Sequence, residues 1–187
     1  MSDIIVFDME WTAWEGSQQR RWSRSDEHRE IVQIGAVRLD SKRFDELRSL
    51  KILVKPSVNI TLSKYFVELT GITQAHVDKY GISLENAIQI FKGFVDGAAA
   101  IFSNGGDEEV FQENCDLIGI RYTLGEAPFY NAHPLLIECT GLSSDAIVSS
   151  KLPELLGIPT VGSSHDALAD ARALAASLIE FGLLPTS

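Results

Sequence analysis

The sequence has few of the features that mark secreted or membrane proteins. Its two cysteines, Cys115 and Cys139, form no C-x-x-C pair, which favours reduced thiols in a cytoplasmic protein over a disulfide framework. Its most apolar stretches, such as residues 31–39 and 97–102, are far too short to cross a bilayer. We therefore expect no membrane partner.

Basic residues are also scarce. The chain has 16 lysines and arginines against 26 aspartates and glutamates, a formal net charge of −10. A protein that holds a long duplex by phosphate contacts normally has a basic surface, so the composition argues against that class. It does not exclude an enzyme that acts on one nucleic-acid end through bound cations, because those cations cancel the charge locally.

What is present is typical of a soluble globular protein. The 187 residues are 45% hydrophobic and 22% charged, so we expect one domain with a substantial core over residues 1–187.

The stretch from Ile4 to Glu10 organises the rest of the chain. Four apolar residues run directly into Asp8 and Glu10, which predicts a strand buried on both faces. Residues two apart in a strand point to the same side, with Cβ atoms roughly 7 Å apart. Two like charges at the end of a core strand need a cation or a shared proton.

The remaining periodicity predicts an α/β fold, with a mixed central sheet of about five strands flanked by helices. Two strands separated by residues 40–42 form an antiparallel hairpin beside the first strand. The expected strands are 4–10, 30–39, 44–54, 97–102 and 129–132. The expected helices are 61–71, 73–79, 83–95, one starting near Asp107, 151–156, and one led by Ser163-Ser164 and ending near Phe181.

The segment from Trp11 to Arg29 follows neither period and is predicted to be a long loop. Interleaved Arg and Trp side chains favour contact with a single strand by phosphate binding and base stacking. Residues 15–30 also contain four arginines and four acids, which cancel and favour a solvated excursion. The sequence leaves both interpretations open.

Three further residues are placed to join Asp8 and Glu10. Asp107 follows a glycine turn at the carboxyl end of a predicted strand, where sites gather in α/β sheets. Asp170 lies early in the final helix between small residues, and His165 precedes it near the helix start. Four carboxylates suit Mg²⁺ or Mn²⁺ rather than Zn²⁺. Two such ions clamp the attacking and leaving oxygens of a phosphoryl displacement, and a histidine can take the proton from water.

Three motifs resemble those of the DEDDh 3′→5′ exonucleases, a family that includes ribonuclease T, oligoribonuclease and the histone-mRNA-type exonucleases. The motifs are Asp8-x-Glu10, Phe102-Ser103-Asn104-Gly105-Gly106-Asp107 and His165-Asp166-Ala167-Leu168-Ala169-Asp170-Ala171-Arg172. The segment Leu69-Thr70-Gly71-Ile72-Thr73, with Lys55-Pro56, is most similar to the histone-mRNA-type branch.

This resemblance implies a ribonuclease H-like, three-layer fold, two Mg²⁺ ions for which Mn²⁺ can substitute, and release of nucleoside 5′-monophosphates. It implies that Asp8, Glu10, Asp107 and Asp170 are the metal ligands and that His165 is the general base. Trp11 is bulkier than the family's usual residue, and the loop after it is longer than in the smaller members. Both differences bear on substrate preference.

Five residues are candidates for substrate binding: Met9, Trp11, Leu69, Thr70 and Asn104. The segment containing Leu69 and Thr70 matches the family segment that lies near the substrate 3′ end. Met9, Trp11 and Leu69 fit either a wedge against terminal bases or a cover over the core. Asn104 fits either a site residue or a turn. Asp166 is expected to be a helix cap, and His76 and His133 are expected to be structural.

The sequence therefore predicts a metal-dependent 3′→5′ exonuclease that acts on single-stranded RNA or DNA ends. Two alternatives stay open: a binding or regulatory module that keeps the fold, and a proofreading exonuclease that works with a DNA polymerase. The choice between RNA and DNA, the protein partners, the oligomeric state and the pathway are not determined.

Overall fold

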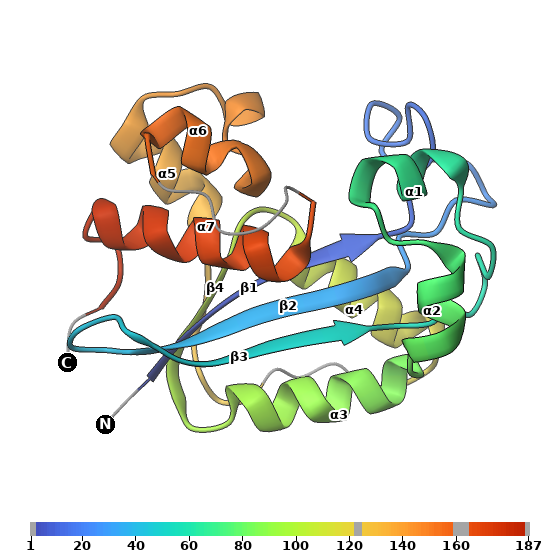
Figure 1. Cartoon of the computed structure of the whole chain (residues 1–187), viewed down its shortest axis with the longest axis horizontal. Helices are drawn as coiled ribbons and strands as arrows, with labels where there is room; N and C mark the ends of the chain where they lie inside the picture. The colour runs from blue at the N-terminus through green and yellow to red at the C-terminus, as the bar shows by residue number, and fades with distance from the viewer. Residues whose placement is uncertain (1–2, 122–124, 159–164, 186–187) are drawn as a thin grey trace.

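A computed structural model describes residues 3–121, 125–158 and 165–185 (Figure 1). The strands are β1 (Asp3–Trp11), β2 (Ile31–Asp40), β3 (Glu46–Leu53), β4 (Ala98–Ser103) and β5 (Phe129–Asn131). The α-helices are α1 (Lys64–Thr70), α2 (Gln74–Tyr80), α3 (Leu84–Val95), α4 (Asp107–Leu117), α5 (Ala132–Thr140), α6 (Leu152–Leu156) and α7 (Ala167–Glu180). Two short 3₁₀ turns are η1 (Ser144–Ala146) and η2 (Ser149–Lys151). No helix of the described ranges is both long enough and apolar enough to span a bilayer.

The five strands form one mixed sheet in the order β3-β2-β1-β4-β5. β1 pairs antiparallel with β2 and parallel with β4, while β2–β3 is the predicted antiparallel hairpin. β5 continues the parallel half beside β4. The predicted mixed sheet of about five strands flanked by helices is confirmed.

Helices cover both faces of this sheet, as the α3 and α7 ribbons show on opposite sides of it in Figure 1. Alternate residues of β1 serve the two layers. Ile5 and Phe7 belong to the core that contains Phe91 of α3, and Phe7 meets Phe91 edge-to-face with ring centroids 5.2 Å apart. Ile4 and Val6 belong to the second core, with residues of α5 and α7. β1 is therefore buried on both faces, as its composition predicted.

Side-chain caps fix where several helices begin. The Ser63, Ser83 and Asp166 side chains accept hydrogen bonds from backbone amides in the first turns of α1, α3 and α7. The helix predicted from residue 61 therefore starts at Lys64, after its cap. The cap predicted for Asp166 is confirmed, whereas Ser163-Ser164 lies outside the described residues.

The third strand begins at Glu46, two residues later than predicted. The Asp40 carboxylate accepts hydrogen bonds from the backbone amides of Lys42 and Arg43, and Phe44 adopts a left-handed φ of 58°. These bonds extend the turn beyond the polar residues that marked it in the sequence.

Candidate active site

Three acidic side chains meet at the carboxyl ends of neighbouring strands. Asp8 and Glu10 lie at the end of β1, and Asp107 is the first residue of α4, which follows parallel strand β4 through Gly105-Gly106. Asp8 and Asp107 are almost completely buried. The strand pairing explains this meeting, because parallel strands place their carboxyl ends at the same edge of the sheet.

The start of α7 is held against the same edge by two residues of β2. Gly35 lies opposite Asp8 in the β1–β2 register, and a Cβ at Gly35 would overlap the backbone of Ala167 and Leu168. Gln33 lies opposite Glu10, and its Oε1 accepts a hydrogen bond of 2.7 Å from the Ala167 amide. The lack of a side chain at Gly35 and the hydrogen bond to Gln33 thus hold α7, which contains Asp170 and Ala171, against β2.

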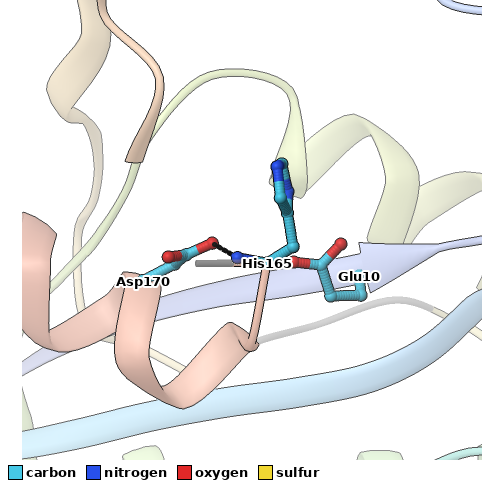
Figure 2. A group of neighbouring side chains, drawn as sticks. All are labelled: Glu10, His165 and Asp170. Atoms are coloured by element: carbon cyan, nitrogen blue, oxygen red, sulfur yellow. Dashed lines mark hydrogen bonds between the residues drawn. The ribbon is translucent and has the colours of Figure 1, made fainter. Parts of the chain in front are cut away.

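Figure 2 shows that Asp170 of α7, and His165 just before the cap of this helix, lie beside Glu10. The ligand atoms of Glu10, His165 and Asp170 all lie within 4.8 Å of one another. His165 has a left-handed φ of 60°, and its backbone amide donates to Asp170 Oδ2 at 3.2 Å. A non-glycine residue in this region is costly, and such residues cluster at functional sites.

Burial raises the pKa of all four carboxyls, and repulsion from the other acids of the group adds to this at Asp8 and Glu10. Burial, followed by the charges of Asp107, Glu10 and Asp170, raises the pKa of Asp8 well above its usual range. Burial and the neighbouring acids raise the pKa of Glu10 to about 8. Burial is also the main reason that the pKa of Asp107 and that of Asp170 are each raised to about 7. Such a group of acids is stabilised by positive charge.

The pKa of His165 shifts in the opposite direction to those of the carboxyls. Burial and the nearby charge of Lys151 lower the pKa of His165 from its usual value. A lowered pKa favours the neutral imidazole at neutral pH, which is the form that can accept a proton.

The donor set fits a hard divalent cation. Asp107 Oδ1 is buried and has no hydrogen-bond partner among the described residues, so this oxygen is available to a ligand. Carboxylate oxygens are the ligands that Mg²⁺ and Mn²⁺ prefer. The chemistry of these residues therefore agrees with the metal site predicted from the sequence.

A cleft of about 760 Å³ opens over these residues. Four of the five predicted substrate-binding residues line it, namely Met9, Trp11, Leu69 and Asn104. Thr70 is not among the lining residues, and its hydroxyl instead donates to the Phe66 carbonyl and accepts from the Ile72 amide. His133, expected to be structural, lines the cleft as well.

Two of the four arginines in the long loop, Arg20 and Arg29, are engaged within the protein, whereas Arg21 and Arg24 are exposed. Arg20 donates through Nε to Glu27 Oε2 at 2.9 Å, and Arg29 donates through Nε to Glu113 Oε2 at 2.9 Å. The loop side chains that line the cleft are instead those of Ser17, Gln18, Gln19 and Trp22, together with Ala13. The pairing of Arg20 and Arg29 favours a folded loop over a flexible arginine arm.

Sequence reasoning missed three residues that support the site. Gln33 and Gly35 appeared only as members of a strand, and Ser149 was not singled out. Ser149 is buried in η2, and its hydroxyl hydrogen-bonds the Asp8 carboxylate. Gly35 and Gln33 break an apolar run at residues two apart, which is the one signal in the sequence that marks a special face of β2.

Comparison with known protein families identifies the family of this chain. The model of the RNase_T exonuclease family matches residues 5–178. The chain belongs to this family. The protein is thus an exonuclease that hydrolyses phosphodiester bonds. The resemblance predicted from its three motifs is confirmed.

Solved structures agree on the fold. The nuclease domain of 3′hExo, a DEDDh family member bound to rAMP, superposes with a TM-score of 0.79 at 22% identity, covering 97% of this chain and 92% of the other. A 3′-exonuclease solved for its recognition of the histone mRNA stem-loop gives 0.79 at 21%, covering 97% and 82%. E. coli Exonuclease I with a dA16 oligonucleotide gives 0.70 at 19%, covering 94% and 40%. No protein of curated function matches significantly.

Proposed function

We propose that this RNase_T exonuclease family member removes nucleotides stepwise from single-stranded 3′ ends of RNA or DNA, in a metal-dependent reaction that releases nucleoside 5′-monophosphates. The observation that supports this most strongly is the meeting of four carboxyls at one sheet edge, all with raised pKa values. We also propose that residues 1–187 act as a single exonuclease domain and that it works in the cytoplasm.

Asp8, Glu10, Asp107 and Asp170 are the residues that would hold two Mg²⁺ ions, with Mn²⁺ able to substitute. When bound, the ions supply the positive charge that stabilises the developing charge on the phosphate and on the departing 3′ oxygen. Two observations support this assignment: Asp107 Oδ1 has no hydrogen-bond partner within the described part of the chain, and Glu10 closely approaches Asp170.

His165 is proposed as the general base. Its neutral imidazole accepts a proton from the attacking water while the water oxygen bonds to phosphorus. The bond between phosphorus and the 3′ oxygen breaks, so the terminal nucleotide leaves with a 5′-phosphate. The strained backbone at His165, tied to Asp170, holds the ring beside the carboxylates.

The form of the cleft supports a single strand as the substrate. Trp11, Trp22 and Tyr65 line it, and aromatic faces of this kind stack on unpaired bases. Solved relatives of the same fold hold rAMP in one case and a dA16 oligonucleotide in another. Both RNA and DNA ends are therefore included in the proposal.

The proposal is tested with matched 5′-labelled single strands of RNA and DNA, incubated with Mg²⁺, Mn²⁺ or EDTA. We expect stepwise shortening that requires a divalent cation, nucleoside 5′-monophosphates as the product, and no shortening by the Asp8→Asn variant. The faster of the two strands identifies the preferred nucleic acid. Shortening that persists in EDTA, or is equal in Asp8→Asn, would contradict the metal assignment.

A further inference from the structure

A line of polar side chains leads from the far wall of the cleft to Asp8. It begins at Ser144 in η1, passes through His133 and Asn104, and reaches Ser149 in η2. These residues come from η1, α5, the turn after β4 and η2, so the line joins four segments of the chain.

The amide group of Asn104 sets the hydrogen-bond roles between His133 and Ser149. Asn104 Nδ2 donates to Ser149 Oγ at 3.0 Å, and His133 Nδ1 lies 3.2 Å from Asn104 Oδ1. The amide oxygen can only accept, so His133 Nδ1 carries the proton. Its Nε2 is then the acceptor in the neutral ring, and the Ser144 hydroxyl donates to it across 2.9 Å.

The bond from Asn104 also determines where the Ser149 hydroxyl directs its proton. Its single hydroxyl proton is not used toward Asn104, since Asn104 is the donor in that bond. The proton is therefore directed to the Asp8 carboxylate, with which the Ser149 hydroxyl hydrogen-bonds. All four bonds run in one direction, from Ser144 to Asp8. Hydrogen bonds aligned in this way polarise one another.

We propose that Ser149, held by Asn104 and His133, is a positioning residue that orients the Asp8 carboxylate for cation binding. The inference rests on the proposed function of Asp8 as a metal ligand. Groups that hydrogen-bond a metal ligand from behind set its orientation, and their loss weakens metal binding by about 10- to 100-fold. Ser149 is suited to this task because it is buried and already oriented by Asn104.

The line also gives Asn104 a role beyond its turn. Its Oδ1 faces His133, and its Nδ2 donates to Ser149 and, at 3.4 Å, to the Ile147 carbonyl. Asn104 thus ties the segment that contains η1 and η2 to the end of β4. Because Ile147 and Ser149 line the cleft, this tie fixes both the wall of the cleft and the ligand beneath it.

The test measures Mn²⁺ binding directly, by calorimetry or by the electron paramagnetic resonance of free Mn²⁺, in the absence of substrate. Ser149→Ala should bind Mn²⁺ about tenfold more weakly than the parent chain. Ser149→Thr keeps a hydroxyl and should recover most of that loss. His133→Ala, two links further away, should lose less than Ser149→Ala. Ser143→Ala is the control, because Ser143 is exposed and makes no capping bond with its side chain.

Two outcomes would overturn the inference. One is an unchanged Mn²⁺ affinity in Ser149→Ala, and the other is an equal loss in Ser143→Ala. Thermal unfolding of each variant shows whether the fold is retained, and His133→Ala, which alters the line without touching Ser149, provides the second variant if Ser149→Ala does not fold. A parent chain that binds no Mn²⁺ would instead contradict the proposed function itself, so the two failures are distinguishable.

Discussion

At the scale of single residues, the site depends on carboxyls whose burial is costly without a cation. Asp8 and Asp107 are nearly inaccessible, and their pKa values are raised mainly by burial. Buried carboxylates without a partner reduce the stability of the folded protein, and a bound cation offsets this cost. His165 differs from them, because burial lowers its pKa and keeps it ready to accept a proton.

Replacing His165 should separate proton transfer from metal binding. His165→Ala is expected to lower the turnover rate by about 10²- to 10⁴-fold, the usual contribution of a general base, while Mn²⁺ affinity stays close to that of the parent. Single-turnover assays and Mn²⁺ titration measure the two quantities. A large loss of Mn²⁺ affinity would show that His165 is a metal ligand instead, since its ring nitrogen lies within 4.8 Å of the ligand oxygens of Glu10 and Asp170.

At the scale of elements, the site depends on the close contact between β2 and the first turn of α7. Gly35→Ala should destabilise the protein by about 1–3 kcal/mol, because the added Cβ meets backbone atoms of Ala167 and Leu168 that cannot rotate away. Denaturant unfolding measures this loss. The shift of α7 should also displace Asp170 and reduce Mn²⁺ affinity.

Gly93 provides the matched control for this substitution. It lies in α3, and a Cβ there would meet nothing within 4 Å. Gly93→Ala should therefore stabilise the protein by about 0.5–1 kcal/mol, the usual helix preference for alanine. Equal effects of the two substitutions would show that the contact at Gly35 is not specific.

The long loop between β1 and β2 contains a pH-sensitive pair. The hydrogen bond from Arg20 is the main cause that lowers the pKa of Glu27 from its usual value. A lowered pKa means that the pair stabilises the loop fully above the usual glutamate value of about 4.3, and that this stability is lost as the pH falls through the lower, folded value.

Acidification below about pH 4.3 should thus loosen the loop. The fluorescence of Trp22, which belongs to the loop and donates to the Thr12 carbonyl, would report the change. Glu27→Gln should lack this acid transition. An identical transition in the variant would assign it to another group.

At the scale of the whole molecule, the acidic composition and the proposed cation site are connected. The chain has a net charge of −10, and four of its acids meet at one edge of the sheet. The parent chain should be stabilised by divalent cations and destabilised by EDTA. Free Mn²⁺ at 100 times its dissociation constant adds about 2.7 kcal/mol.

For a chain of this size, each kcal/mol of added stability raises the midpoint of thermal unfolding by about 2–4 °C. Scanning calorimetry with Mn²⁺, with EDTA and with Asp8→Asn measures the effect. The variant should respond much less to Mn²⁺. An equal response would place the stabilising cation elsewhere.

The sequence alone determined the family and the class of the fold. Strand alternation is local, so Asp8 and Glu10 had to share a face, and the apolar runs around them had to form a covered sheet. The spacing from His165 to Asp170 is likewise local. These features need only residues a few positions apart.

Only the tertiary structure decided what supports the site. The Gln33 side chain accepts a hydrogen bond from the Ala167 amide, 134 positions further along the chain. Ser149 reaches Asp8 from η2, and Arg20 pairs with Glu27. No periodicity encodes such contacts, because they depend on which segments the packed sheet and helices bring together. The residues proposed as ligands could be predicted from the sequence, whereas the residues that hold them in place appeared only in the folded chain.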